Sequence, residues 1–125
     1  MPHLTLEHTS NVQPSLEFDD LFQQLHMVLA ENGINISNCK SRAVQRDRFY
    51  VAEGDHSAAF VHLDVRFMEG RSPESKQTIG QRLLGALREC FVAPAGINDL
   101  QITVEILDIE RTAYFKFPTG TLNYK

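Results

Sequence analysis

One pattern of strand, helix and strand occurs twice along this chain, and it constrains the fold more than any other feature. The first copy covers about residues 2–52 and the second about residues 57–109; the copies share their layout but not their residues. A helix between two strands joins them as parallel neighbours through a crossover. We therefore expect an α+β fold with one four-stranded mixed sheet and both helices on one face. A polar and aromatic tail, residues 110–125, follows the second copy.

Local signals place the ends of these elements. Apolar residues alternate with polar ones in the expected strands and recur every three or four residues in the expected helices. Ser15 and Ser72 are suitable helix N-caps, and Pro73 fits the first helical position. Asn32-Gly33 is a helix stop. We expect strands over residues 2–9, 38–52, 57–67 and 101–109, and helices over residues 16–32 and from 72 to a stop before Pro94.

Two helices on one face leave the other face of such a sheet bare. A chain of 125 residues forms a single domain, residues 1–125, and has no third layer for that face. We therefore expect a homo-oligomer in which other copies of the chain supply the cover.

Charge and hydropathy exclude several classes of function. The net charge of −4 argues against nucleic acid as the main partner. No segment has the run of about 20 apolar residues that a membrane helix needs, and the N-terminus has no signal-peptide pattern. The two cysteines match no metal-binding spacing and the five histidines fit no zinc pattern, so we expect reduced thiols, a structural role for His62 and no metal. A cytoplasmic protein without nucleic-acid or membrane partners fits this pattern.

Pro2 is the sharpest candidate for chemistry. Removal of Met1 would leave Pro2 with a free secondary amine, whereas an attached Met1 makes the same nitrogen an amide without basicity. A free α-amino group has an ordinary pKa of about 7.7–8.0, and burial or nearby cations lower it. Such a group is a suitable general base near neutral pH. A Met-Pro start is nevertheless common and by itself does not define a site.

Cationic side chains are the second group of candidates. Arg71 lies in a loop just before a helix N-terminus, where anions bind readily. Lys40 and Arg42 are two residues apart on an expected strand and therefore point to the same face. Carboxylates are natural ligands for such groups, with arginine able to bind them through two hydrogen bonds. Each residue is equally typical of a solvated surface, so charge alone leaves both interpretations open.

Several segments together resemble a known family. They are PHLTLEHTSN (2–11), KSR (40–42), AFVHLDV (59–65), GRSPESKQ (70–77) and the tail from Tyr114 to Lys125. In these segments, which span nearly the whole chain, the sequence is similar to the 5-carboxymethyl-2-hydroxymuconate isomerase family of the tautomerase superfamily.

This resemblance implies a homotrimer with its sheets facing inward and an active site near each Pro2. It implies isomerisation of a dienol polycarboxylate to its conjugated keto form, in homoprotocatechuate degradation and without a metal or organic cofactor. Pro2 would be the general base, and Arg71, Lys40 and Arg42 would bind the substrate. Where the family has Arg-Ser-Arg, this chain has Lys40-Ser41-Arg42, and lysine lacks the two-pronged guanidinium. That difference leaves open another small enol such as phenylpyruvate as substrate, and a trimeric acid-binding protein without catalysis is a further alternative.

Overall fold

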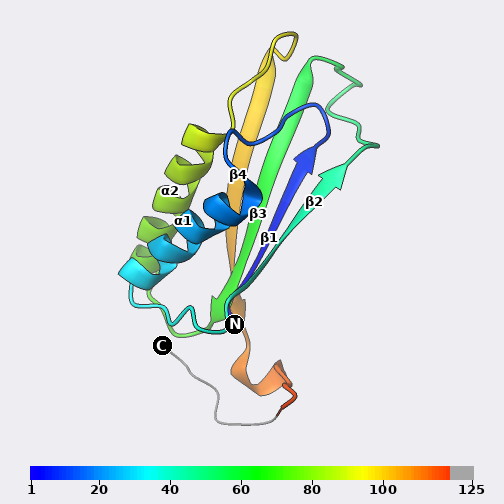
Figure 1. Cartoon of the computed structure of the whole chain (residues 1–125). Helices are drawn as coiled ribbons and strands as arrows, with labels where there is room; N and C mark the ends of the chain where they lie inside the picture. The colour runs from blue at the N-terminus through cyan, green and yellow to red at the C-terminus, as the bar shows by residue number, and fades with distance from the viewer. Residues whose placement is uncertain (119–125) are drawn as a thin grey trace.

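Four strands form one mixed sheet in the order β2-β1-β3-β4 (Figure 1). The structure is a computed structural model, and it describes residues 1–118. The strands are β1 (His3–Thr9), β2 (Lys40–Arg46), β3 (Ala58–Met68) and β4 (Asp99–Ile109). The pairs β1–β2 and β3–β4 are parallel, as two crossovers require, and β1 and β3 meet as antiparallel neighbours. The expected four-stranded mixed sheet is confirmed.

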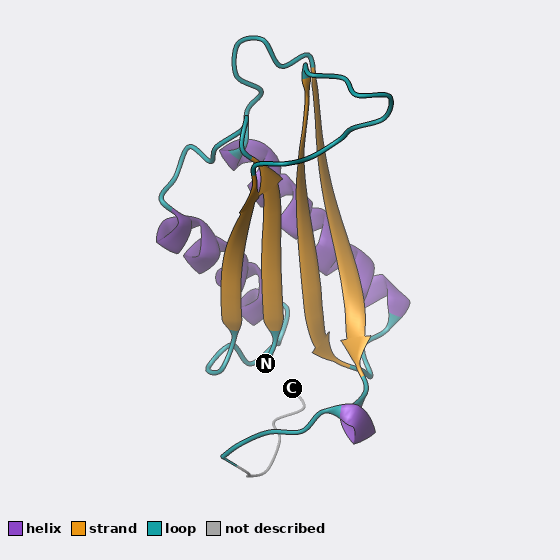
Figure 2. Ribbon diagram, turned by 90° about the vertical axis from the view of Figure 1, so that its right-hand side faces the viewer, coloured by secondary structure: helices purple, strands orange, loops and turns teal. Residues whose placement is uncertain are grey.

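Both helices pack on the same face of this sheet and leave the other face bare (Figure 2). They are α1 (Phe18–Glu31) and α2 (Pro73–Cys90), and a short 3-10 helix, η1 (Arg111–Ala113), follows β4. The core lies between helices and sheet and contains the apolar side of each element, including Leu4 and Leu6 of β1, Leu21 and Leu25 of α1, Leu63 and Val65 of β3, and Leu83 and Leu87 of α2. All eight of these side chains are fully buried. No helix within residues 1–118 is long and apolar enough to cross a membrane.

The start of α2 follows its local sequence signals, whereas the start of α1 does not. The Ser72 side chain accepts a hydrogen bond from the Ser75 amide at 3.1 Å and Pro73 is the first helical residue, so the predicted start of α2 is confirmed. The predicted cap Ser15 is wrong, because α1 has Glu17 at its N-cap with no side-chain hydrogen bond. The amide of Ser15 instead donates to the Cys90 carbonyl at 2.9 Å. This tertiary contact involves the amide of the predicted cap, and α1 begins only at Phe18.

The end of α1 matters for the loop that follows it. The amide of Gly33 donates to the Ala30 carbonyl at 3.0 Å, and the amide of Ile34 donates to the Leu29 carbonyl at 3.0 Å. This pair of bonds defines a Schellman motif, which needs a left-handed residue between helix and loop. Gly33 has φ +83° and supplies it. The predicted Asn32-Gly33 stop is confirmed, and it directs residues 34–39 towards the start of β1.

β2 is shorter than the expected strand over residues 38–52. It pairs only with β1, in a register that runs from His3 opposite Lys40 to Thr9 opposite Arg46. Beyond Thr9 the first strand ends in a turn, so β2 has no partner after Arg46 and its chain leaves the sheet. The other strand bounds differ from expectation by one or two residues.

Candidate active site

The start of the chain is fixed at one end of the sheet. Pro2 is buried, and its carbonyl accepts a hydrogen bond from the Lys40 amide at 3.0 Å, which extends the β1–β2 ladder by one residue. The terminal ammonium of Met1 donates to the Asn38 carbonyl at 2.7 Å. Pro2 therefore lies beside the first residues of β2, as its position at the head of a strand predicts.

A cavity of about 230 Å³ lies next to this end of the sheet. The loop after α1 forms one of its walls and the tail after η1 forms another, and both segments lie near the N-terminus in Figure 1. Its lining residues are Met1, Asn35, Ser37, Asn38, Lys40, Tyr114, Phe115, Lys116 and Phe117. Three of them carry a positive charge: the Met1 ammonium, Lys40 and Lys116. The cavity therefore favours an anionic ligand.

The environment of the terminal amine lowers its pKa below the ordinary value of 8.0. Burial is the largest cause, because it disfavours the charged form; the positive charges of Lys40 and Lys116 act in the same direction. The Lys40 ammonium donates to the Asn38 carbonyl at 3.1 Å, the same oxygen that accepts from Met1. Two cationic nitrogens therefore share one acceptor at the cavity wall.

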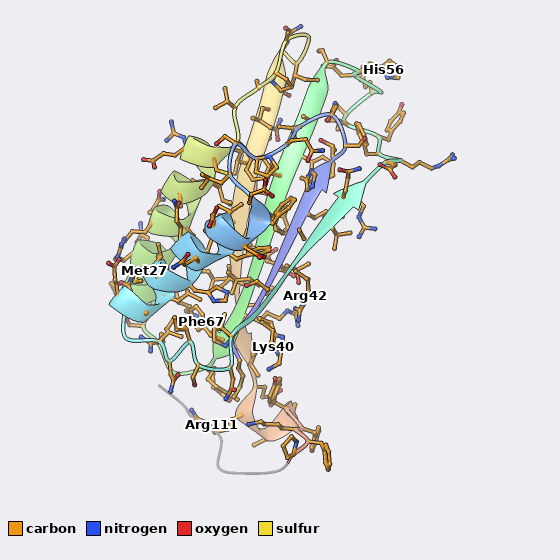
Figure 3. The ribbon with its side chains drawn as sticks, viewed as in Figure 1. Met27, Lys40, Arg42, His56, Phe67 and Arg111 are labelled. Carbon is orange, nitrogen blue, oxygen red and sulfur yellow. The ribbon has the colours of Figure 1, made fainter. Side chains whose placement is uncertain are left out.

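Arg42 lies on the bare face of the sheet and does not line the cavity. Its guanidinium donates to Nδ1 of His3 at 3.2 Å and to the Thr5 hydroxyl at 3.5 Å. Nε2 of His3 is in turn 2.8 Å from the hydroxyl of Tyr114, which does line the cavity. Figure 3 shows Arg42 and Lys40 near one another at the start of β2. Arg42 is thus connected to the cavity through two intermediate side chains.

Arg71 occupies a different place from Lys40. Its guanidinium donates to the carbonyls of Asn32 and Gly33, both at 2.9 Å, and so completes the end of α1. It lines a separate hollow of about 530 Å³, which Arg111 also lines. The structure therefore brings Pro2 and Lys40 together and does not bring Arg71 into their cavity. A substrate contact by Arg71 stays a prediction.

One group of side chains could hold a metal ion. The ligand atoms of His62, Asp64 and Glu105 lie within 4.8 Å of one another on the bare face of the sheet. His62 Nδ1 is also 2.6 Å from the Thr103 hydroxyl, and its Nε2 is 3.8 Å from the Glu105 carboxylate. Strand pairing creates this group, and a spacing argument along the chain does not reveal it. Exposed acidic groups commonly gather without a metal, so the predicted absence of a metal site remains a prediction.

Sequence reasoning did not single out His3, Tyr114 or Lys116 as site residues. His3 follows Pro2 directly, but its hydrogen bonds depend on Arg42, which pairs with Thr5 in the sheet, and on Tyr114, 111 positions along the chain. Tyr114 and Lys116 lie in a tail without periodicity. The signal that could have pointed to them is the resemblance itself, which extends into this tail.

Solved structures define the class of protein to which this chain belongs. The structure is similar to a 5-carboxymethyl-2-hydroxymuconate isomerase from Deinococcus radiodurans R1, with a TM-score of 0.76 and 28% identity over 92% of this chain and 87% of that one. It also resembles a fused 4-OT wild-type symmetric trimer, with a TM-score of 0.65 and 19% identity over 88% of this chain and 87% of that one, a likeness that shows the fold. The chain thus has the fold of the tautomerase superfamily.

Sequence comparison narrows this class to one family. The family model described as 5-carboxymethyl-2-hydroxymuconate isomerase matches residues 2–119. The 5-carboxymethyl-2-hydroxymuconate Delta-isomerase of Escherichia coli is 31% identical over 117 residues, which cover 93% of each chain. The chain belongs to the 5-carboxymethyl-2-hydroxymuconate isomerase family. The predicted resemblance and the predicted enzyme class, an isomerase, are both confirmed.

Proposed function

We propose that this protein is a keto–enol tautomerase that converts 5-carboxymethyl-2-hydroxymuconate to its conjugated oxo form, as part of homoprotocatechuate degradation. Its general base is the secondary amine of Pro2 after removal of Met1. The observation that carries the proposal is the buried start of β1 beside a cationic cavity. Family membership supplies the substrate class, since the substrate appears in the names of the relatives.

The covalent geometry of the chain start connects Pro2 to the cavity. Met1 lines the cavity, and the Pro2 nitrogen is bonded to the Met1 carbonyl carbon. Removal of Met1 therefore enlarges the cavity and leaves the Pro2 amine at its edge. Burial and the positive charges of Lys40 and Lys116 lower the pKa of the Met1 amine. Pro2 is itself buried and its carbonyl accepts from the Lys40 amide, so we infer that its free amine would meet similar surroundings. A lowered pKa leaves more of the amine unprotonated at neutral pH, which is the state that a general base requires.

The reaction then needs one base and a set of positive charges. The Pro2 nitrogen takes the proton of the 2-hydroxyl and leaves a dienolate. Lys40 and Lys116 stabilise the negative charge on this intermediate and hold the carboxylates of the substrate. The protonated Pro2 amine then delivers the proton to carbon 5, which gives the conjugated ketone and regenerates the base. No metal or organic cofactor enters this scheme.

We also propose that the active form is a homotrimer. The support is the fold, because a structure with the same fold is a symmetric trimer. In a trimer, a neighbouring subunit can complete the cavity where its rim is open. Arg71 lies outside the cavity of a single chain. In this proposal it binds substrate only if a neighbouring subunit brings the two together.

The decisive test compares processed and unprocessed protein. Mass spectrometry first establishes whether Met1 is absent, and ultraviolet absorbance then follows conversion of the dienol acid to the enone. We expect catalysis by the processed protein and none by a matched sample that retains Met1. Pro2→Ala should lose most of the activity. A processed wild-type protein that does not exceed the buffer rate with any 2-hydroxymuconate-type acid would refute the proposal.

Lys40 favours a second candidate within the same chemistry, a smaller enol such as phenylpyruvate. Lysine binds a carboxylate as a point charge, whereas arginine can bind it through two parallel hydrogen bonds. A chain with lysine at this position has less geometric preference for a polycarboxylate. Rates on enols with one, two and three carboxylates separate the candidates: a kcat/KM that rises with each carboxylate supports the first, and a flat series supports the second.

A further inference from the structure

We propose that the Tyr114 hydroxyl donates a hydrogen bond to the 2-oxygen of the dienolate, and that His3 and Arg42 position this hydroxyl for the purpose. The inference rests on the proposed function and adds to it one residue that would touch the reacting atoms, Tyr114, and two positioning residues, His3 and Arg42. It starts from a chain of hydrogen bonds that runs from the bare face of the sheet into the cavity.

The direction of each hydrogen bond in this chain follows from its donors. A guanidinium has only donors, so Nδ1 of His3 must accept from Arg42 over the 3.2 Å between them. A neutral imidazole that accepts at Nδ1 carries its hydrogen on Nε2. That nitrogen therefore donates to the Tyr114 oxygen, 2.8 Å away. The hydrogen of the Tyr114 hydroxyl is not used in this bond.

The surroundings of His3 keep it in this neutral form. Burial lowers its pKa below 6.5, and the terminal ammonium, Arg42, Lys40 and Arg66 lower it further. These charged groups belong to three of the segments packed around the ring: the chain start, β2 with Arg42 and Lys40, and β3 with Arg66 opposite His3. The fourth segment is the tail, which contributes the Tyr114 hydroxyl. All are cations, so protonation of His3 would add a positive charge among positive charges. The hydrogen-bond directions therefore hold at neutral pH.

The free hydrogen of Tyr114 is placed where the reaction needs a donor. Tyr114 lines the same cavity as Met1, Lys40 and Lys116, and residues 1–118 contain no acceptor within hydrogen-bond distance for this hydrogen. Lysine charges suit the carboxylates, which are charged throughout the reaction. A neutral, oriented hydroxyl suits an oxygen that gains charge only when the 2-hydroxyl is deprotonated, because such a donor acts mainly on the transition state.

The experiment compares Tyr114→Phe with Tyr50→Phe as a matched control. Tyr50 is 77% exposed and lies between β2 and β3, away from the cavity. With processed protein and 5-carboxymethyl-2-hydroxymuconate, Y114F should lower kcat about 10- to 100-fold, the loss expected for one hydrogen bond to a charged oxygen, and change KM little, while Y50F should behave as wild type. His3→Leu should match Y114F. His3→Gln, whose amide can still accept from Arg42 and donate to Tyr114, should keep a kcat several-fold above that of His3→Leu.

A spectroscopic measurement tests the hydrogen-bond chain without turnover. Nitrogen-15 chemical shifts of the His3 ring should show an unprotonated Nδ1 and a protonated Nε2 in wild type and in Y114F. The opposite tautomer would overturn the inference, as would a Y114F kcat within twofold of wild type or an effect confined to KM. Active wild type with unaffected Y114F refutes this inference alone, whereas inactive processed wild type refutes the proposed function and this inference together.

Discussion

Replacement of Arg71 by alanine tests a contact that the structure shows and a role that only the sequence predicts. The Arg71 guanidinium donates two hydrogen bonds of 2.9 Å to the carbonyls of Asn32 and Gly33. Hydrogen bonds that involve a charged group contribute about 1.5–3 kcal/mol each when they are buried. Gly33 is exposed and Arg71 is only half-buried, so water recovers part of this energy in the variant. We therefore expect Arg71→Ala to lower the free energy of unfolding by about 1–2 kcal/mol in total.

Urea denaturation at one fixed protein concentration measures this loss, because association would otherwise shift the midpoint. Arg71→Lys should recover only part of it, since one ammonium cannot bond both carbonyls as a guanidinium does. The matched control is Arg48→Ala, which removes an exposed arginine that has no hydrogen bond or ion pair within the described part of the chain. That control should stay within about 0.5 kcal/mol of wild type. Equal stability of the two alanine variants would refute the capping role.

The same variant separates stability from substrate binding. If Arg71 also binds a carboxylate of the substrate, kcat/KM of the folded Arg71→Ala protein should fall by about tenfold or more, which corresponds to about 1.4 kcal/mol or more. Unchanged kcat/KM in the folded variant would refute the substrate role and leave Arg71 with its contact to the end of α1.

Three further predictions concern the same end of the molecule. Gly33→Ala should lower the free energy of unfolding by about 1 kcal/mol in urea titrations, because alanine at φ +83° is strained even though its Cβ would meet Arg71 only at 3.8 Å; an unchanged midpoint would contradict this. Burial lowers the pKa of His26 below 6.5, so the unfolded state binds more protons and the free energy of unfolding should fall as pH drops below 6.5. His26→Gln should flatten this pH dependence, and the same pH dependence in both proteins would contradict the prediction. In processed enzyme, kcat/KM should rise with pH to a plateau with an apparent pKa below 8.0. Lys40→Gln should raise this apparent pKa, because it removes a cation that lowers the pKa of the terminal amine. An apparent pKa that stays the same or falls would show that Lys40 does not lower the pKa of the base.

The sequence predicts those parts of the fold that depend on neighbouring residues. Ser72, Pro73 and the Asn32-Gly33 stop are local signals, and the structure has a helix end at each. The two crossovers predict one four-stranded mixed sheet with both helices on one face, whereas the strand order comes from the structure. The two wrong boundaries, at the start of α1 and the end of β2, result from tertiary contacts. The bond from Ser15 to Cys90 delays the start of α1, and the length of β1 limits that of β2. Neither partner is visible from the residues next to the predicted boundary.

In the candidate site, too, some residues are predicted from the sequence, whereas the long-range contacts are not. Pro2 is predicted at the head of one strand and Lys40 within another, and the parallel pairing of β1 with β2 brings them together. The contact between His3 and Tyr114 joins residues that are 111 positions apart. Arg71 lies 38 and 39 positions from the two residues whose carbonyls it contacts. A motif can show which residue types are present, but only the folded chain shows which partner each side chain has.

The tail after η1 gives a reason for assembly in addition to the bare face of the sheet. A missing third layer would demand a partner if this face were apolar. It is instead polar, with an ion pair between Arg46 and Glu7 at 2.6 Å and a hydrogen bond between His62 and Thr103 at 2.6 Å. A sheet of this kind can face water on one side. The two most exposed large apolar side chains among the described residues are Phe115 and Phe117, which are 89% and 94% exposed and line the cavity. Burial of these two rings by another subunit would stabilise an oligomer and narrow the cavity at once. We therefore expect Phe115→Ser and Phe117→Ser to weaken assembly and catalysis together, whereas independent effects would separate the interface from the site.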